Sequence, residues 1–408
     1  MGFVASVARE TRAVFGGARG RSLGAIALTW GTLLGTRMIY PVLLPYFRSS
    51  FDLSLTIAGF LVTILWLGSA LGQLPGGLLA DRFSERSVMI ASTGFVSIAV
   101  VGVVIAWSPL VLFVATAFIG LGQSLYPIAR ITILSKIYPD RIGSALGVTM
   151  ATGDLGQTVF PPVAGTLAAA IAWQAGLTFL VPLLLLSGIA LWITLPGRTG
   201  TDGSTDPDES AGTISIETGR RVFEALKQPD MRLMGLILFL YIFIWQSFTG
   251  LYPTYLVEEK GLSSSMAGLL FSLFFAVGVI VKPVSGAAYD RIGMRLSLIG
   301  VLLGPIIGFA LLPVVDRLWH LMVLTVLVST MLGSGAITQS FLADAFPESV
   351  RGTGLGTIRT VVATLGAAGP VVFAAIADRG FFDEGYFLLA GIMVVIVLLT
   401  ARTSPAGS

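Results

Sequence analysis

Five charged residues lie inside long apolar runs of the sequence. They are Arg37, Arg130, Asp154, Lys282 and Arg359. An ionisable group in the hydrocarbon of a bilayer costs at least about 2.5 kcal/mol, so such residues indicate a functional site. Four of the five are cations, and the planar fork of arginine matches the geometry of a carboxylate or a phosphate. The set predicts a positively charged site for a small anion.

Asp154 is the one acidic member of this set. Burial and neighbouring arginines shift the proton affinity of a carboxyl group in opposite directions, which is how such a group can be made to titrate. Asp154 is therefore a candidate proton carrier, with Arg130 beside it in this role. The alternative is a static ion pair with Arg37 or Arg130, and the sequence leaves both interpretations open.

The runs that hold these residues are long enough to cross a membrane. The chain is 55% hydrophobic and 12% charged, with a mean hydropathy of +0.89, whereas soluble domains carry about 25% charged residues. A spanning helix needs about 20 mostly apolar residues. The sequence predicts twelve such helices, at 23–47, 54–79, 87–108, 110–135, 143–170, 173–195, 232–257, 265–288, 296–315, 318–342, 352–377 and 385–401.

One long polar stretch divides these helices into two sets of six. We predict a cytoplasmic lead-in at 1–22, a first six-helix bundle at 23–195, a second at 232–401 and a cytoplasmic tail at 402–408. Residues 196–231 between the bundles read as a flexible linker followed by a short amphipathic helix. Most of the 25 Lys and Arg residues fall on the cytoplasmic side if both termini lie there, which fixes the orientation by the positive-inside rule.

Several classes of protein are excluded by composition. The chain has no cysteine and one histidine, His320, so it predicts no metal site and no cofactor. No phosphate-binding loop and no convergent nucleophile and base are present, so an enzyme is not expected. The net charge of +3 comes from basic residues scattered between apolar runs, so nucleic acid is not an expected partner. The expected surroundings are a lipid bilayer.

The two halves of the sequence match each other in register. "GLLADRFSER" at 77–86 returns as "GAAYDRIGMR" at 286–295, and Pro161 falls opposite Pro370 at the same offset. The chain is thus predicted to be a duplicated six-helix unit with both copies in one orientation. This register places Arg37 opposite Gln246, Gln73 opposite Lys282, Arg130 opposite Thr338 and Met150 opposite Arg359.

The repeated turn resembles the G-x-x-x-D-R-x-G-R-R signature of the major facilitator superfamily, and the resemblance covers essentially the whole chain. The first copy has Gly77, Asp81, Arg82 and Arg86, with Ser84 where the family usually has glycine; the second has Gly286, Asp290, Arg291, Gly293 and Arg295. The resemblance implies an all-α membrane protein of twelve helices in two pseudo-twofold-related bundles that rock about a central site. It assigns the two turns to a cytoplasmic gate, with each Asp accepting from a helix N-terminus of the opposite bundle. The alternative is that these residues only cap a short turn.

The stretch "VKPVSGAAYD" resembles the eighth helix of the monocarboxylate-transporter branch, with Lys282 at the position of that branch's substrate-binding arginine. The branch usually has an Asp one turn earlier, where this chain has Gly278. The predicted substrate-binding residues are Arg37, Lys282, Arg359, Gln246 and Tyr126. The expected protein is a secondary transporter of a small organic anion in the cell membrane of a prokaryote, functional as a monomer, with protons as a candidate co-substrate.

Two other functions remain open at this point. Aromatic residues of the helices could form the apolar pocket of a proton-driven exporter of hydrophobic compounds, although most such residues pack helices or lie at membrane interfaces. A receptor or scaffold that moves nothing is the third reading. It is disfavoured because it would not need four cations within its helices.

Overall fold

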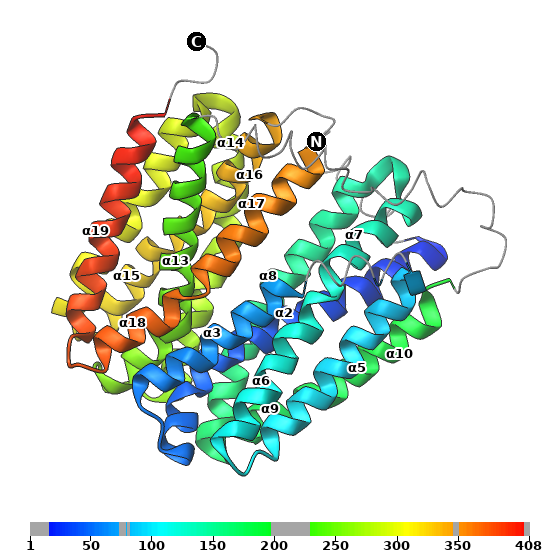
Figure 1. The fold of residues 1–408 in the computed structure, drawn as a ribbon, viewed down its shortest axis with the longest axis horizontal. Helices are drawn as coiled ribbons and strands as arrows, with labels where there is room; N and C mark the ends of the chain where they lie inside the picture. The colour runs from blue at the N-terminus through cyan, green and yellow to red at the C-terminus, as the bar shows by residue number, and fades with distance from the viewer. Residues whose placement is uncertain (1–15, 73–78, 80–81, 197–228, 346–350, 404–408) are drawn as a thin grey trace.

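The computed structural model describes residues 16–72, 79, 82–196, 229–345 and 351–403, and these residues form helices and short connections (Figure 1). The N-terminal bundle contains α2 (Gly17–Phe51), α3 (Leu55–Leu71), α5 (Glu85–Val104), α6 (Pro109–Ser124), α7 (Tyr126–Ile137), α8 (Ile142–Ala170), α9 (Ala175–Thr178) and α10 (Leu180–Thr194). A 3-10 turn, η1 (Pro139–Arg141), lies between α7 and α8.

The C-terminal bundle contains α13 (Pro229–Glu258), α14 (Ser264–Leu311), α15 (Leu318–Ser329), α16 (Ser334–Ala345), α17 (Arg351–Gly366), α18 (Gly369–Ala377) and α19 (Phe382–Ala401). The 3-10 turns η2 (Leu312–Val314) and η3 (Thr330–Gly333) complete it. Figure 1 shows this bundle, with α13 in green and α19 in red, beside the helices of the N-terminal bundle, which run from blue (α2) to green (α10). We call the end of the molecule where α2 begins and α19 ends the terminal face, and the opposite end the distal face.

The twelve predicted spans are recovered in the described residues. Eight helical stretches are long and apolar enough to cross a membrane, and one of them, Ser264–Val314, is two spans joined at Gly293. The apolar helix α3 and the less hydropathic α2 and α8, of 35 and 29 residues, supply the remaining three. Helix α2 begins at Gly17, inside the segment expected to be a lead-in. The expected linker and amphipathic helix lie largely outside the described residues.

The repeat seen in the sequence appears as matched local structure. Ser54 and Ser263 cap the N-termini of α3 and α14, accepting from the backbone N–H of Ile57 (3.2 Å) and Met266 (3.3 Å). A Ser at this position satisfies one of the unpaired N–H groups of a first helical turn. Both capped ends lie at the distal face.

The two charged turns share an unusual backbone conformation. Gly293 has φ 76°, and Ser84, at the matched position of the first copy, has φ 150°. Positive φ strains a residue with a Cβ, so glycine is the residue that fits. Ser84 also has a positive φ, although one far from that of Gly293, and it caps α5 by accepting from the Ser87 N–H (3.2 Å).

A hydrogen bond between a tyrosine and a threonine joins two helices inside each bundle, at matched positions of the repeat. The hydroxyls of Tyr40 and Thr116 lie 3.0 Å apart between α2 and α6, and those of Tyr252 and Thr325 lie 2.5 Å apart between α13 and α15. A buried hydroxyl without a partner is costly, so these bonds fix how the first and fourth spans of each half pack.

Candidate substrate site between the two bundles

Arg37 lies in the middle of α2 and is held by neutral groups. Its Nε donates to Oε1 of Gln123 (2.9 Å), and the Nε2 of Gln123 in turn donates to the carbonyl of Leu33 (2.9 Å). The guanidinium group lies over the ring of Trp66, 4.7 Å from its centroid. Stacking on an aromatic face stabilises a cation but does not neutralise it. No carboxylate of the described residues is within ion-pair distance of Arg37.

The Trp66 ring connects Arg37 to the other bundle. Trp66 of α3 and Trp245 of α13 meet edge to face, with their centroids 5.1 Å apart. Gln246 follows Trp245, is 3% exposed, and its Oε1 has no hydrogen-bond partner in the described part of the chain. The two tryptophan rings thus connect Arg37 to the interface between the bundles.

Arg130, which is buried whereas Arg37 is half-buried, also lacks a carboxylate partner among the described residues. It is 7% exposed, donates from Nη1 to the hydroxyl of Thr149 (2.7 Å) and lies 4.1 Å over the ring of Trp30, while its Nε has no partner in this part of the chain. Trp30 also stacks on Tyr126, at 6.0 Å between centroids. The hydroxyl of Tyr126 donates to the carbonyl of Ile26 (2.9 Å), so Tyr126 joins α7 to α2.

Asp154 and Lys282 form an ion pair across the two bundles. Lys282 Nζ on α14 lies 2.6 Å from Asp154 Oδ1 on α8, and 34% and 15% of the two side chains are exposed. Gln157 Nε2 donates to the same oxygen (3.3 Å). The static pair considered from the sequence had Arg37 or Arg130 as the partner of Asp154, and this was wrong. Sequence spacing carries no signal for a contact between residues that lie in different halves.

Arg359 lies on α17, and its side chain makes one long hydrogen bond. Its side chain is exposed, and its Nη2 is 3.5 Å from Oε1 of Gln339 on α16, at the limit of a hydrogen bond. Long donor–acceptor distances contribute little energy. The structure does not show Arg359 in contact with Arg37 or Lys282.

The residues of the predicted gate are only partly described. Gly77 and Asp81 lie outside the described residues. Arg82 is exposed beside the ring of Phe83 (5.7 Å), and Arg86 Nη2 donates to the carbonyl of Trp192 (2.5 Å). Gly286, Asp290, Arg291 and Arg295 lie on α14 around the Gly293 bend, with the three charged side chains exposed.

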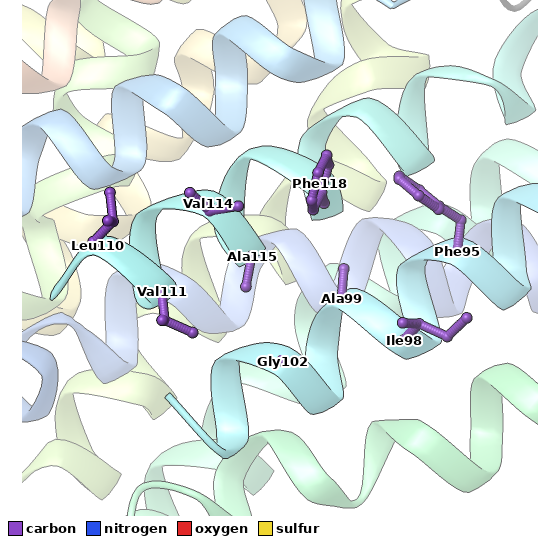
Figure 2. A pocket seen from close by; sticks show the side chains of 9 residues that line it. All are labelled: Phe95, Ile98, Ala99, Gly102, Leu110, Val111, Val114, Ala115 and Phe118. Carbon is purple, nitrogen blue, oxygen red and sulfur yellow. The ribbon is translucent and has the colours of Figure 1, made fainter. Parts of the chain in front are cut away.

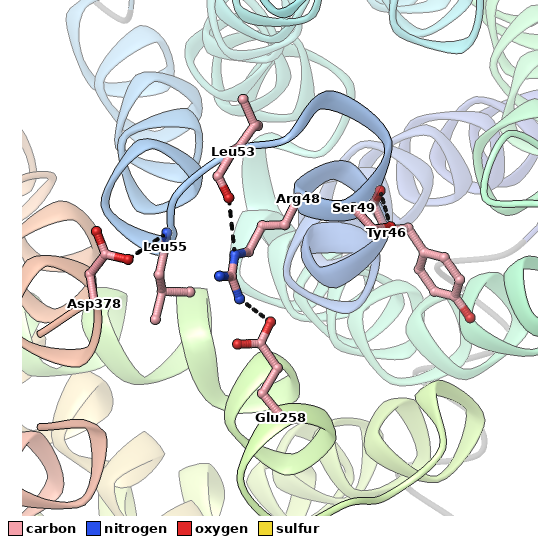
Figure 3. Close-up of polar contacts among 7 residues, drawn as sticks. All are labelled: Tyr46, Arg48, Ser49, Leu53, Leu55, Glu258 and Asp378. Carbon is pink, nitrogen blue, oxygen red and sulfur yellow. Dashed lines mark hydrogen bonds and ion pairs between the residues drawn. The ribbon is translucent and has the colours of Figure 1, made fainter. Parts of the chain in front are cut away.

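A polar lock that the sequence did not predict joins the bundles at the distal face (Figure 3). Asp378, after α18, accepts from the N–H of Leu55 (3.0 Å) and the hydroxyl of Thr56 (2.7 Å) in the first turn of α3. Arg48 of α2 forms an ion pair with Glu258 of α13 beside it. Burial raises the pKa of Asp378, but the hydrogen bonds from Thr56, Leu55 and Ser54 outweigh this and hold the pKa below its usual value. The sequence carries no signal for this contact, because Asp378 and the start of α3 lie in different halves of the chain.

The helix backbones pack closely next to this lock. A Cβ at Gly59 of α3 would lie 2.8 Å from the carbonyl oxygen of Pro370, and one at Gly250 of α13 would lie 3.2 Å from Val62. The backbone N–H of Val371 donates to the hydroxyl of Thr63 (3.3 Å). Small residues permit this approach between membrane helices. The two bundles are therefore closed against each other at the distal face.

A hollow of about 350 Å³ lies on the outside of the N-terminal bundle, between α5 and α6 (Figure 2). Its lining is apolar and includes Phe95, Ile98 and Phe118. Ile98 is 73% exposed, so the hollow opens to the surroundings of the helices. It has no charged group for an anion and is not the candidate substrate site.

Two six-helix bundles with uncompensated cations at and near their interface have the architecture of a membrane transporter. A family model described as Major Facilitator Superfamily matches residues 25–370, and again residues 234–407. The chain belongs to this superfamily; it is a multi-pass membrane transporter and not an enzyme. The family resemblance noted in the sequence is confirmed.

Curated relatives match over most of their length. The chain is 23% identical to the "Hexuronate transporter" of Bacillus subtilis, covering 87% of each chain, and 25% identical to the "Nitrite extrusion protein" of the same organism, covering 93% of this chain and 91% of the relative. It is also 28% identical to "Multidrug resistance protein MdtG" of Citrobacter koseri, but over only 36% of this chain and 37% of the relative.

Solved structures confirm the fold. The D-xylose-proton symporter superposes with a TM-score of 0.77 at 16% identity, covering 94% of this chain and 98% of the symporter. A bacterial homolog of the human lysosomal transporter Spinster, in an inward-facing and occupied conformation, also gives 0.77 at 16% identity and covers 94% of this chain and 96% of its own. At this identity the likeness concerns the fold alone.

Proposed function

We propose that the protein is a secondary active transporter that moves a small organic anion, recognised by a carboxylate, across the cell membrane by alternating access. The observation that supports this most directly is that two arginines within the helices, the half-buried Arg37 and the buried Arg130, lack a carboxylate partner among the described residues. Each is held by neutral hydrogen-bond acceptors and a tryptophan face.

The physical argument concerns uncompensated charge. A cation in the membrane interior is tolerated when a counter-charge accompanies it, and Asp154 is already neutralised by Lys282. The two arginines therefore favour the entry of an anion. Arg37 is better placed to bind substrate, because Trp66 links it to the interface with the C-terminal bundle, where a ligand would contact both moving parts.

The names of the full-length relatives agree with this proposal. Hexuronate and nitrite are both anions, and those two relatives cover most of the chain, whereas the multidrug protein matches only about a third of it. The aromatic residues that an exporter would use also have packing roles. Tyr40, Tyr126, Tyr241 and Tyr252 are buried and hydrogen-bonded inside their own bundles. The exporter remains the alternative with the weaker support.

The proposed orientation places the terminal face in the cytoplasm, by the distribution of Lys and Arg. The distal lock then closes the external side. Asp378 at the first turn of α3 uses the same chemistry that we propose for Asp81 and Asp290 at the cytoplasmic gate, a carboxylate at a helix N-terminus of the other bundle. Alternating access would break one set of contacts while the other forms.

A thermal-shift screen of the purified protein tests the proposal. A ligand that binds only the folded state raises the Tm. We expect small carboxylates to raise it and lipophilic cations to leave it unchanged, with the carboxylate shift lost in Arg37→Gln. Arg317→Gln, which removes an exposed arginine before α15, is the control and should keep the shift. Stabilisation by lipophilic cations alone would favour the exporter.

A further inference from the structure

The apolar hollow between α5 and α6 is built by small residues of the first repeat. Ala99 and Ala115 are buried at its base, and a Cβ at Gly102 would lie 3.3 Å from the Cβ of Ala115. The rings of Phe95 and Phe118 meet edge to face, 5.5 Å between centroids, and close one end of the hollow (Figure 2). The two helices are thus close at the base, and the space of about 350 Å³ exists because the side chains there are small.

The second repeat carries larger side chains at the matched positions. The register of the two charged turns places Leu311 opposite Gly102 and Leu324 opposite Ala115. Leu324 is 5% exposed, and a Cβ at Gly308 would lie 3.3 Å from its carbonyl oxygen, so α14 and α15 are packed together at this point. The difference in sequence between the repeats, and not the shared fold, therefore provides the space between α5 and α6.

The hollow lies in the half of the membrane next to the distal face. Helix α5 ends and α6 begins at that face, and Trp107 in the connection between them is 78% exposed. Tryptophan is enriched at the membrane–water interface, so Trp107 marks the bilayer surface. The lining of α6 from Leu110 to Phe118 covers about 12 Å at 1.5 Å per residue. The hydrocarbon core is about 30 Å thick, so the hollow extends through most of one leaflet.

The lining favours hydrocarbon and offers nothing to a charged group. Its side chains are aliphatic or aromatic, and the sequence has no charged residue between Arg86 and Arg130. Lipid tails are as apolar as these side chains, so binding here depends on van der Waals packing. A flexible chain of methylene groups fits a narrow space between two helices and gains dispersion contacts with both. Residues of the same lipid-facing surface, such as Val101 on α5 and Leu121 on α6, continue the apolar surface beyond the hollow.

We infer that this hollow is a binding site for one acyl chain of a bilayer phospholipid, from the leaflet next to the distal face, with its headgroup at the level of Trp107. The bound chain completes the packing between α5 and α6 that leucine side chains complete in the second repeat. Recognition is through the chain, because no charged residue of α5 or α6 lies near the headgroup. The site lies on the outside of the N-terminal bundle and does not depend on the proposed anion transport.

A phosphatidylcholine that carries a photoreactive diazirine in one acyl chain tests the inference. The full-length protein is reconstituted in phosphatidylcholine liposomes with a trace of this probe, irradiated and digested, and the adducts are located by mass spectrometry. We expect adducts to concentrate on 95–118 relative to the matched segment 304–327. Val114→Trp fills the hollow from its rim and should lower the adducts on 95–118 about fivefold or more, because the chain loses the dispersion contacts that hold it.

The matched control is Val323→Trp. Val323 of α15 lies opposite Val114 of α6 in the repeat, and the two valines are 50% and 46% exposed. The control therefore makes the same substitution at the same depth on the other bundle, and it should leave the adducts on 95–118 unchanged. Leu110→Trp, at the other end of the hollow from Phe118, serves if Val114→Trp does not fold, and the Tm of each variant reports on folding.

Three results would overturn the inference. Adducts spread evenly over the lipid-facing helices, or adducts on 95–118 that survive in Val114→Trp, would show that no acyl chain is held in the hollow. Selective loss of these adducts on addition of the lipophilic cation tetraphenylphosphonium would assign the hollow to hydrophobic compounds. A dimer that Val114→Trp converts to a monomer would assign it to a second copy of the chain.

Discussion

The carboxylate of Asp378 in the C-terminal bundle accepts a 3.0 Å hydrogen bond from the backbone N–H of Leu55 in the first turn of α3, which belongs to the N-terminal bundle. The hydroxyl of Thr56 donates to its other oxygen at 2.7 Å. A carboxylate at a helix N-terminus is favoured by the unpaired N–H groups and by the helix dipole. This contact ties the two bundles together at the distal face.

Removing the Asp378 carboxylate should loosen the distal face. The chain has no cysteine, so Thr63→Cys gives a single thiol in the buried interface between α3 and α18. In this background we expect Asp378→Ala to raise the rate of alkylation by a membrane-impermeant maleimide about two- to tenfold, the effect of losing two exposed charge-assisted hydrogen bonds. Glu384→Ala, an acidic residue of α19, is the control. An unchanged rate would show that the lock does not hold the face closed.

The same lock should not respond to pH near neutrality. Hydrogen bonds keep the pKa of Asp378 below its ordinary value of 3.8 despite burial, which opposes them. A lowered pKa in the closed state means that the stabilisation is complete above the ordinary pKa and is lost as the pH falls through the lowered one. The labelling rate of Thr63→Cys, corrected for thiol ionisation with the unfolded protein, should therefore be flat between about pH 5 and pH 7. A rise within this window would assign the lock to another group.

Adding a single methyl group at the distal face should lower the Tm, because the helix backbones of the two bundles are in contact there. A Cβ at Gly59 would lie 2.8 Å from the carbonyl oxygen of Pro370, and a backbone atom cannot rotate away. We expect Gly59→Ala to lower the Tm and to speed labelling of Thr63→Cys. Gly94→Ala, on α5 with nothing within 4 Å of its Cβ position, should raise the Tm slightly through helix propensity. Equal Tm values for the two variants would contradict this packing.

The pair of Lys282 and Asp154 should behave as one unit. Removing either partner leaves an unpaired charge in the membrane, which we expect to cost about 1 to 3 kcal/mol, discounted for the partial exposure of Lys282. The double variant Asp154→Asn with Lys282→Gln should recover much of the lost Tm, which a double-variant cycle would measure. Independent, additive losses would mean that the contact contributes nothing.

The same four proteins also test whether Asp154 carries a proton during transport. If Asp154 is only a static partner, uptake by the double variant should retain its dependence on pH. If Asp154 carries a proton, uptake by Asp154→Asn should lose that dependence whether or not Lys282 is present. Uptake measured at two external pH values in all four proteins distinguishes these cases.

The architecture could be predicted from the sequence because membranes impose strong local rules. Span length, apolar composition and the repeated turn are all short-range features, and they led to twelve helices in two matched halves. The choice of Arg37 and Asp154 as candidate site residues followed from the cost of charge in lipid. The partners of these residues did not follow. Asp154 with Lys282, Arg48 with Glu258 and Asp378 with α3 are contacts between bundles, and their register depends on how the two halves dock.

Uptake of a radiolabelled carboxylate that raises the Tm measures the central claim most directly, in proteoliposomes that contain the wild type, Arg37→Gln or the control Arg317→Gln at equal protein content. We expect saturable uptake by the wild type, a loss of about tenfold or more in Arg37→Gln, as for a removed charge-assisted contact, and retention in Arg317→Gln. Full uptake by folded Arg37→Gln would contradict an anion site at this arginine.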